Sequence, residues 1–395
     1  MKVEEILDSI YKIMEDEDFH EGVKRAVQNS TAAVARILSS DQMIQELAGE
    51  LREKKEAVLS DISHYLELTM KGIEKVNGRA YLAKTPEDAR QIIADIVGTR
   101  KKIVVCSKSM VIEELEIEKH LRGLNHEVWG TDLGQFLVEL SGDKPMHGIV
   151  PALHLTKEAA ANLLAHRVGF DLQGGETIEE IVQQVRAFLR EKFSRAEVGI
   201  SGCNCIAADS GAVFLVENEG NIRLTTALPP IHIAVVGVEK IMPTMVDSFK
   251  TVIVQSAFAG LYPPTYVSLI AGPSSTADIE YYRVYGANGP QELHVIFVDN
   301  GRLEAIEHPI LKDQLLCIRC GRCQMECPVW GAAANIWGGP VYGGPMGINW
   351  TAITLGENYA APFSLFCLGC GRCDVVCPLE IPLSEILHYL KGKIE

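Results

Sequence analysis

Apolar positions recur at helical spacing in the first part of the chain and as short continuous runs further along it. Between residues 3 and 73, hydrophobic side chains return with the period of an amphipathic helix. We expect about three helices here, with a cap between two of them at Ser40 and Asp41. Residues 1–76 are therefore predicted to be a helical segment that packs on the next domain or on a partner subunit.

Residues 77–308 alternate short apolar runs with amphipathic stretches. The apolar runs predict strands at residues 102–106, 127–129, 147–150, 196–200, 212–216, 232–237, 267–270 and 293–298. The amphipathic stretches predict helices at residues 111–124, 156–166 and 177–193. Such alternation is typical of an α/β domain with a mostly parallel sheet, in which ligands usually bind at the carboxyl ends of the strands.

The pattern changes after residue 309, where eight of the eleven cysteines fall into two runs of equal spacing. The runs are Cys317-x2-Cys320-x2-Cys323-x3-Cys327-Pro328 and Cys367-x2-Cys370-x2-Cys373-x3-Cys377-Pro378. This spacing holds two 4Fe–4S clusters, because each close trio binds one cluster and the fourth cysteine ligates the other. The predicted ligand sets are Cys317, Cys320, Cys323 and Cys377 for cluster 1, and Cys367, Cys370, Cys373 and Cys327 for cluster 2.

Zinc and disulfide bonds are the competing explanations for these cysteines. Zinc ribbons use two separated pairs of ligands, whereas each run here has three close cysteines and a fourth. Disulfides belong mostly to short secreted chains, but this chain has 395 residues and an acidic, helical N-terminus unlike a secretory leader. We expect residues 309–395 to form an α-helical, ferredoxin-like domain with two 4Fe–4S clusters.

The charge and hydropathy of the chain limit its partners. A formal net charge of −15 argues against a nucleic-acid partner, because phosphate binding needs clustered lysine and arginine. No apolar stretch is long enough to predict a membrane span. We expect a cytoplasmic protein, since a reducing compartment suits oxygen-sensitive clusters, and peripheral attachment to a membrane complex is compatible with the sequence.

Two polar loops of the α/β domain are candidates for binding an anion or substrate. Ser107-Lys108-Ser109 follows one predicted strand, Ser274-Ser275-Thr276 follows a glycine turn after another, and each loop is expected to precede a helix. Amides at a helix N-terminus, together with hydroxyls and a lysine, can hold an anion, although serine is also an ordinary N-cap. His154 and His232 lie beside predicted strand ends, where each is either a general base or a structural histidine.

Other residues carry weaker signals. Cys203 and Cys205 are too closely spaced for a metal site and are expected to be buried hydrophobes. Arg319, Arg322 and Arg372 lie inside the cysteine runs, where they would raise a cluster's potential, dock an acidic partner or simply be solvated. No dinucleotide or triphosphate motif is present. Since hydride removal needs a two-electron carrier such as a flavin, the residues favour an electron-transfer subunit over a complete enzyme.

Several collinear stretches resemble the lactate utilisation protein B family. SKSMVIEELEIEKHL, TDLGQFLVELSGDKP, VPALHLTKE, GPSSTADIE and residues 199–244 are similar to its LUD domain. CIRCGRCQMECPVW, YGGPMG and CLGCGRCDVVCPLEIPLSEIL are similar to its ferredoxin-like region. The resemblance runs from about Ala57 to His388. It implies a LUD domain with the α/β fold of sugar-phosphate isomerases and CoA transferases, and cluster ligation by the eight cysteines of the two runs.

The resemblance also implies a function and partners. The family's protein is an iron–sulfur subunit of a three-component system that oxidises L-lactate to pyruvate. Its partners are a heterodisulfide-reductase-like, cysteine-rich subunit and a second LUD protein. Relatives typically extend well beyond the second cysteine run, whereas this sequence ends at Glu395, so the resemblance does not extend to the docking contacts of that region. Two alternatives stay open: electron transfer for a different 2-hydroxy acid dehydrogenase, such as one with a flavoprotein donor, or a CoA- or acyl-binding LUD module with structural clusters.

Overall fold

Four helices form the N-terminal part of the computed structural model, which describes residues 3–172 and 175–394. They are α1 (Val3–Met14), α2 (Glu17–Ser40), α3 (Met43–Ser60) and α4 (Ile62–Lys75). The expected helical segment is therefore confirmed, with one helix more than the periodicity suggested. The predicted cap lies where α2 ends, and the Asp41 carboxylate accepts a hydrogen bond from the backbone N–H of Met43 at 3.1 Å.

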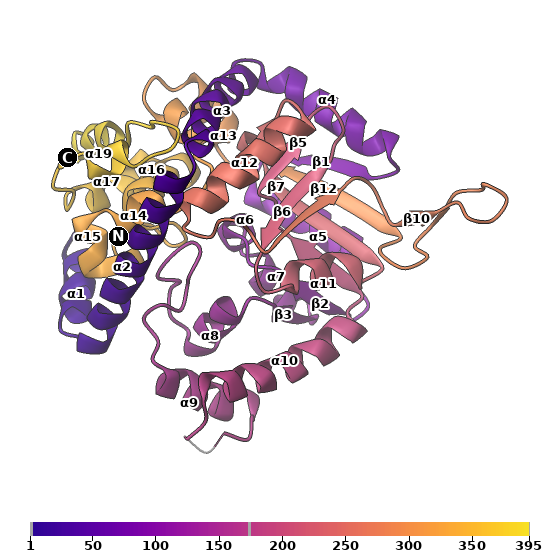
Figure 1. The fold of residues 1–395 in the computed structure, drawn as a ribbon, viewed down its shortest axis with the longest axis horizontal. Coiled ribbons are helices and arrows are strands. Elements are labelled where there is room, and N and C mark those ends of the chain that lie inside the picture. The colour runs from indigo at the N-terminus through magenta and orange to yellow at the C-terminus, as the bar shows by residue number, and fades with distance from the viewer. Residues whose placement is uncertain (1–2, 173–174, 395) are drawn as a thin grey trace.

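A six-stranded, entirely parallel sheet forms the centre of the molecule (Figure 1). Its strands, in spatial order, are β1 (Arg79–Ala83), β12 (Glu292–Val298), β7 (Ile231–Gly237), β4 (Val198–Ser201), β2 (Ile103–Cys106) and β3 (Glu127–Gly130). The inner strands β12 and β7 are almost continuously apolar and buried. This is expected of a parallel sheet that is covered on both faces.

Helices cover both faces of this sheet. They are α5 (Pro86–Val97), α6 (Met110–Glu114), α7 (Ile117–Gly123), α8 (Leu133–Ser141), α9 (Lys157–Val168), α10 (Ile178–Arg195), α11 (Asn221–Ala227) and α13 (Arg302–Glu307). One face packs on α5, α6 and α7, and the other on α4 and α13. The predicted α/β class with a mostly parallel sheet is therefore confirmed.

A second, smaller sheet lies beside the first. Its strands, in spatial order, are β8 (Ile241–Met242), β5 (Cys205–Ala207), β6 (Val213–Glu217) and β9 (Tyr266–Ile270). Helix α12 (Met245–Phe258) packs on this sheet and on α3, while the 3-10 helix η1 (Val238–Lys240) precedes β8. Beyond β9, the hairpin of β10 (Ser275–Thr276) and β11 (Val284–Tyr285) projects from the body of the molecule (Figure 1).

The C-terminal region is helical and contains both cysteine runs. Its elements are η2 (Leu311–Leu316), α14 (Arg322–Met325), α15 (Pro328–Ala333), η3 (Ala334–Ile336), α16 (Gly344–Leu355), α17 (Glu357–Ser364), α18 (Arg372–Val375) and α19 (Leu383–Lys391). The long helix α2 contacts α14 and α15 as well as α12, so the N-terminal helices join this region to the α/β domain. Within the described residues, no helix is both long and apolar enough to cross a membrane.

Three local predictions were wrong. Residues 147–150 form a loop rather than a strand. The helix predicted over residues 111–124 is divided into α6 and α7, because Glu116 adopts a left-handed conformation with φ of 51°. Ser274-Ser275-Thr276 leads into a hairpin strand and does not precede a helix.

Candidate functional site

The two cysteine runs fold into equivalent loop-and-helix units. In each run, a glycine with positive φ precedes a short helix: Gly321 at 75° before α14, and Gly371 at 69° before α18. Glycine adopts this conformation without a steric penalty, so the loop can turn sharply between the second and third cysteines. The backbone N–H of Arg319 points to the Cys317 sulfur and that of Gly369 to the Cys367 sulfur, both at 3.4 Å.

Each unit borders a small cavity that also receives one cysteine from the other run. The cavity of the first run, here called cavity A, is lined by Cys317, Cys320, Cys323 and Cys377. The cavity of the second run, cavity B, is lined by Cys367, Cys370, Cys373 and Cys327. This three-plus-one arrangement in both directions is what crossed cluster ligation requires. Among the described residues, no group of three or more His, Cys, Asp or Glu side chains is arranged to hold a metal ion directly.

The state of the thiols fits a metal cluster as their partner. Burial raises the pKa of Cys327 and of Cys377 to about 11, and it raises the pKa of Cys320 further. All eleven cysteines are free of disulfides. Metal binding needs thiolates and releases the protons of the thiols. The positive charge of iron would therefore stabilise the negative thiolates that burial alone disfavours.

The two cavities differ in their surroundings. Around cavity A, the segment from Cys320 to Met325 is buried without interruption. Around cavity B, Cys370 is exposed, and the neighbouring Leu368 and Val375 are 70% and 87% exposed. Cys317 and Cys377 of cavity A are half-buried and Cys373 of cavity B is buried, so cavity A has the more buried lining while cavity B reaches the surface at Cys370.

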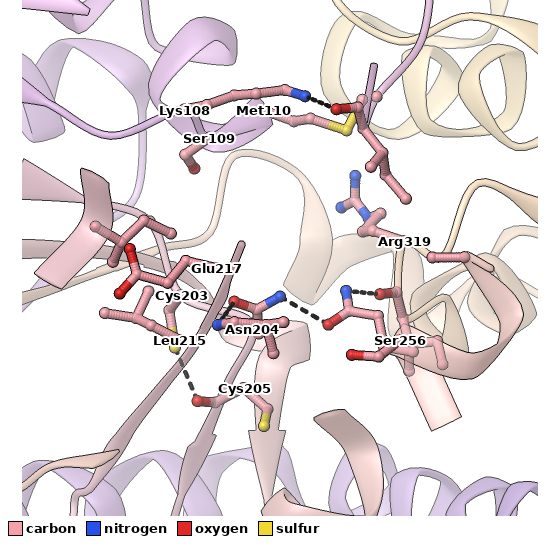
Figure 2. A pocket seen from close by; sticks show the side chains of 18 of the residues that line it. Lys108, Ser109, Met110, Cys203, Asn204, Cys205, Leu215, Glu217, Ser256 and Arg319 are labelled. Carbon is pink, nitrogen blue, oxygen red and sulfur yellow. Dashed lines mark hydrogen bonds between the residues drawn. The ribbon is translucent and has the colours of Figure 1, made fainter. Parts of the chain in front are cut away.

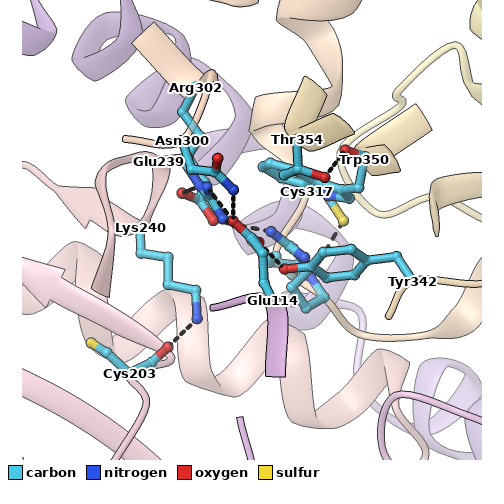
Figure 3. Close-up of polar contacts among 12 residues, drawn as sticks. Glu114, Cys203, Glu239, Lys240, Asn300, Arg302, Cys317, Tyr342, Trp350 and Thr354 are labelled. Atoms are coloured by element: carbon cyan, nitrogen blue, oxygen red, sulfur yellow. Dashed lines mark hydrogen bonds and ion pairs between the residues drawn. The ribbon is translucent and has the colours of Figure 1, made fainter. Parts of the chain in front are cut away.

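A buried charge network fastens the first run to the α/β domain (Figure 3). Arg302 of α13 contacts Glu114 at 2.8 Å and Glu239 at 2.7 Å, and Arg319 of the first run contacts Glu239 at 3.1 Å. The Tyr342 hydroxyl donates to Glu114 at 2.5 Å. Although burial alone would raise the pKa of the Glu239 carboxyl, the Arg302 and Arg319 guanidiniums lower it to about 2, so the network is ionised.

A third cavity, the large cavity, has a volume of about 400 Å³ and lies between the α/β domain and the first run (Figure 2). Its lining includes Ser107 and Gly202, which follow the carboxyl ends of β2 and β4. Cys317 and Arg319 of the first run also line it. Its volume is in the range of small-molecule sites, and it lies at the strand ends where the sequence predicted a ligand.

The structure brings only some of the predicted pocket residues together. Ser107-Lys108-Ser109 lines the large cavity, and the Lys108 ammonium donates to the backbone carbonyl of Ile149 at 2.7 Å. Ser274-Ser275-Thr276 does not line it and belongs to the projecting hairpin. The two loops therefore do not face one pocket.

The two candidate histidines also lie outside the lining of the large cavity. His154 is paired with Asp143 at 3.3 Å. His232 is buried in β7, where its Nε2 atom and the Ser201 hydroxyl are 2.8 Å apart, and burial lowers its pKa to about 3. Both have the surroundings of structural histidines, since neither faces the cavity.

Sequence reasoning missed several residues of the large cavity. Lys55 comes from α3, Lys240 from η1 and Ser256 from α12. They are far apart in the sequence and belong to no motif, so only the fold brings them together. Cys203 and Cys205 are buried, as expected, but they also line this cavity.

Comparisons with known proteins agree with this two-part architecture. Residues 66–298 match the LUD domain family, and residues 313–381 match the 4Fe-4S dicluster domain family. A lactate utilization protein B from Shouchella clausii is 35% identical over 365 residues, which is 91% of this chain and 74% of that protein. The uncharacterized electron transport protein YkgF of Escherichia coli is 35% identical over 334 residues, or 82% of this chain and 67% of that protein.

A third relative gives the same result. The lactate utilization protein B of Bacillus subtilis is 34% identical over 330 residues, covering 82% of this chain and 66% of that protein. Each of these matches covers at least 82% of this chain. The chain therefore carries a 4Fe-4S dicluster domain, and it belongs to the lactate utilization protein B family.

Proposed function

We propose that this chain is the iron–sulfur electron-transfer subunit of a system that oxidises L-lactate to pyruvate. The observation that supports it is the three-plus-one distribution of thiols in both small cavities. In this assignment cavity A holds cluster 1 and cavity B holds cluster 2, with the ligand sets that the spacing predicts. Each 4Fe–4S cluster, when bound, takes up and releases one electron at a time.

The different surroundings of the two cavities suggest a direction for electron transfer. Cavity A adjoins the large cavity inside the protein, whereas cavity B reaches the surface at Cys370. We assign cavity A to the donor side and cavity B to the side of the acceptor. The exposed apolar side chains of Leu368 and Val375 would then contact the accepting subunit.

The proposal includes partners, because lactate oxidation removes two electrons and a hydride acceptor such as a flavin is needed for their joint removal. A heterodisulfide-reductase-like subunit and a second LUD protein fit the relatives' place in lactate utilization, and a flavoprotein is the alternative donor. The free cysteines fit a reducing compartment such as the cytoplasm.

Anoxic purification followed by metal analysis tests this function. We expect about eight irons per chain and no stoichiometric zinc, since each of the two clusters contains four irons. Together with the co-purifying subunits, L-lactate should reduce the clusters, as followed by electron paramagnetic resonance. Stoichiometric zinc in place of iron would reject the two clusters. Clusters that stay oxidised with lactate but are reduced by another 2-hydroxy acid would reject lactate as the substrate.

A further inference from the structure

The large cavity and cavity A share part of their walls. Cys317 and Ile318 line both of them. A molecule in the large cavity would therefore lie next to Cys317, which we assign as a ligand of cluster 1. Cys327 and the other residues of cavity B line no part of the large cavity.

The large cavity is lined by positive groups that have donors to spare. Lys55, Lys108 and Lys240 each donate to a backbone carbonyl oxygen, at 2.6, 2.7 and 2.5 Å. In the described part of the chain, none of these three ammonium groups forms an ion pair with a carboxylate. An ammonium has three donors, so each retains capacity for a further acceptor.

The acidic groups of the lining are already engaged. The Glu217 carboxylate accepts from the backbone N–H of Arg223 at 3.1 Å and pairs with its guanidinium at 3.3 Å. The Asp132 carboxylate accepts from the backbone N–H of Gln135 at 2.9 Å, as the cap of α8. The third carboxylate of the lining, Glu219, accepts from the backbone N–H of Leu133 at 3.3 Å. The lining therefore sets three lysines and Arg319, which have unused donors, against three carboxylates that each already have a partner, and this balance favours an anion.

Three buried side chains of the lining have polar atoms without a partner. They are the Ser107 hydroxyl, the Ser256 hydroxyl, and the Nε and Nη1 atoms of Arg319. Ser107 is 1% exposed, Ser256 is 3% exposed and the Arg319 side chain is 9% exposed. An unsatisfied buried polar group is costly and calls for an explanation, and a ligand that accepts from these donors supplies one.

Arg319 is held in place on its other sides. Its guanidinium stacks on Trp350 at 3.8 Å from the ring centre, and its Nη2 atom contacts Glu239. It lines the large cavity but not cavity A. Figure 2 shows Arg319 between Met110 and Ser256, across the cavity from Glu217.

From these contacts we propose that the large cavity binds the carboxylate of a small 2-hydroxy or 2-oxo acid, and that this anion controls cluster 1 but not cluster 2. The assignment of the acid class rests on the proposed function. The Arg319 guanidinium and the two serine hydroxyls donate to the ligand, and the lysines balance its charge. Because the anion lies beside Cys317, it opposes the addition of an electron to cluster 1. By linkage, reduction of cluster 1 weakens anion binding by the same factor.

Isothermal titration calorimetry with L-lactate and with pyruvate tests binding to the complete, iron-loaded chain. The double substitution Ser107→Ala and Ser256→Ala should weaken binding about tenfold or more, because each hydroxyl donates to a charged acceptor. The midpoint temperature of thermal unfolding of this double variant should not fall, since neither hydroxyl has a partner in the free protein.

Ser248→Ala is the matched control. Ser248 is buried on the same helix as Ser256 but lies outside the cavity, and its hydroxyl donates to the Thr244 carbonyl oxygen at 3.0 Å. This variant should unfold more easily and bind the acids as the unaltered chain does. Unchanged binding in the double variant, or no binding of either acid to the unaltered chain, would overturn the proposal.

Redox titration in the presence of pyruvate gives a second readout. Saturating pyruvate should lower the potential of cluster 1 by about 59 mV for each tenfold weakening of binding on reduction, and leave cluster 2 unchanged. Equal shifts of both clusters contradict the link through Cys317. Flavin mononucleotide, which carries a phosphate, serves as a competing ligand. If it bound and pyruvate did not displace it, the assignment of the ligand as a 2-hydroxy or 2-oxo acid would be wrong. The iron content is measured on the same sample, so a failure of the electron-transfer function is recognised separately from a failure of acid binding.

Discussion

The two cysteine runs have the same spacing, the same glycine and the same arginine, but they differ in how deeply they are buried. In the first run, Arg322 is 8% exposed and contacts the Thr31 hydroxyl at 3.2 Å and the Glu326 carboxylate at 2.5 Å. Its counterpart in the second run, Arg372, is exposed. The spacing of the cysteines thus determines the ligand geometry, while the segments packed around each run determine its access to solvent and to the large cavity.

The cause of this difference lies outside the runs. The first run is enclosed by α2, through Thr31, and by the α/β domain, through Glu239. The second run follows α17 and is covered on one side by α19. Two copies of one motif can therefore form a more buried and a more exposed site, which is the division that the proposed electron transfer to a partner subunit would use.

The fourth cysteines provide the strongest way to test this comparison. Cys327→Ser should abolish the exposed cluster 2, and Cys377→Ser the buried cluster 1, because each fourth cysteine lines the cavity of the other run. Each variant should lose about four of its eight irons. Iron analysis with electron paramagnetic resonance distinguishes the two losses. If Cys327→Ser removed the cluster held by Cys317, Cys320 and Cys323, the crossed assignment would be wrong.

The charge network that encloses the first run should make a large contribution to stability. Arg302→Met should lower the free energy of unfolding by about 3–5 kcal/mol, because it leaves Glu114 and Glu239 buried without their main counter-charge. Chemical denaturation under anoxic conditions measures this. Adding Glu114→Gln and Glu239→Gln should restore part of the loss.

The exposed arginine of the second run is the control for this prediction. Arg372→Met should change the free energy of unfolding by less than about 0.5 kcal/mol, as surface substitutions usually do. A similar cost for both substitutions would show that the burial of the first run does not depend on the network.

Solvent access predicts a smaller, kinetic difference between the clusters. A hydrophilic iron chelator should remove cluster 2 several times faster than cluster 1, because Cys370 is exposed whereas Cys320 and Cys323 are 9% and 8% exposed. Iron release followed by absorbance, with the remaining cluster identified by electron paramagnetic resonance, checks the order. Simultaneous loss would mean that the two sites open together.

Local sequence patterns were sufficient to predict the cysteine motifs and the fold class, but not the surroundings of each cysteine run. The cysteine spacing and the apolar runs of β7 and β12 are local signals, so the dicluster domain and the α/β class could be predicted. The contact of Arg319 with Glu239 joins residues 80 positions apart, and that of Lys55 with Glu239 joins residues 184 positions apart. Their place in the large cavity depends on how the domains pack, which no periodicity encodes.

The wrong expectations have the same origin. Ser274-Ser275-Thr276 has the composition of an anion-binding loop, but it belongs to a hairpin whose side chains Ile279 and Tyr281 are 80% and 94% exposed. For His232 the sequence left a general base and a structural histidine open, and the parallel pairing of β7 with β4 and β12 places this side chain in a buried position away from the large cavity. In both cases the residue type suggested a binding or catalytic site, but the position of the residue in the fold could not be predicted from the sequence.

The exposed face at cavity B supplies the smallest expected change in the isolated chain. Leu368→Asp should alter the free energy of unfolding by less than about 0.5 kcal/mol, because this side chain is 70% exposed. Electron transfer to the accepting subunit should nevertheless slow, since a charge would be placed in the core of the contact, where interfaces are depleted in charge. Leu124→Asp, on the α/β domain and 46% exposed, should leave that rate unchanged. Stopped-flow reduction of the purified acceptor measures both rates, and equal rates for the two variants would place the docking surface away from the exposed cluster.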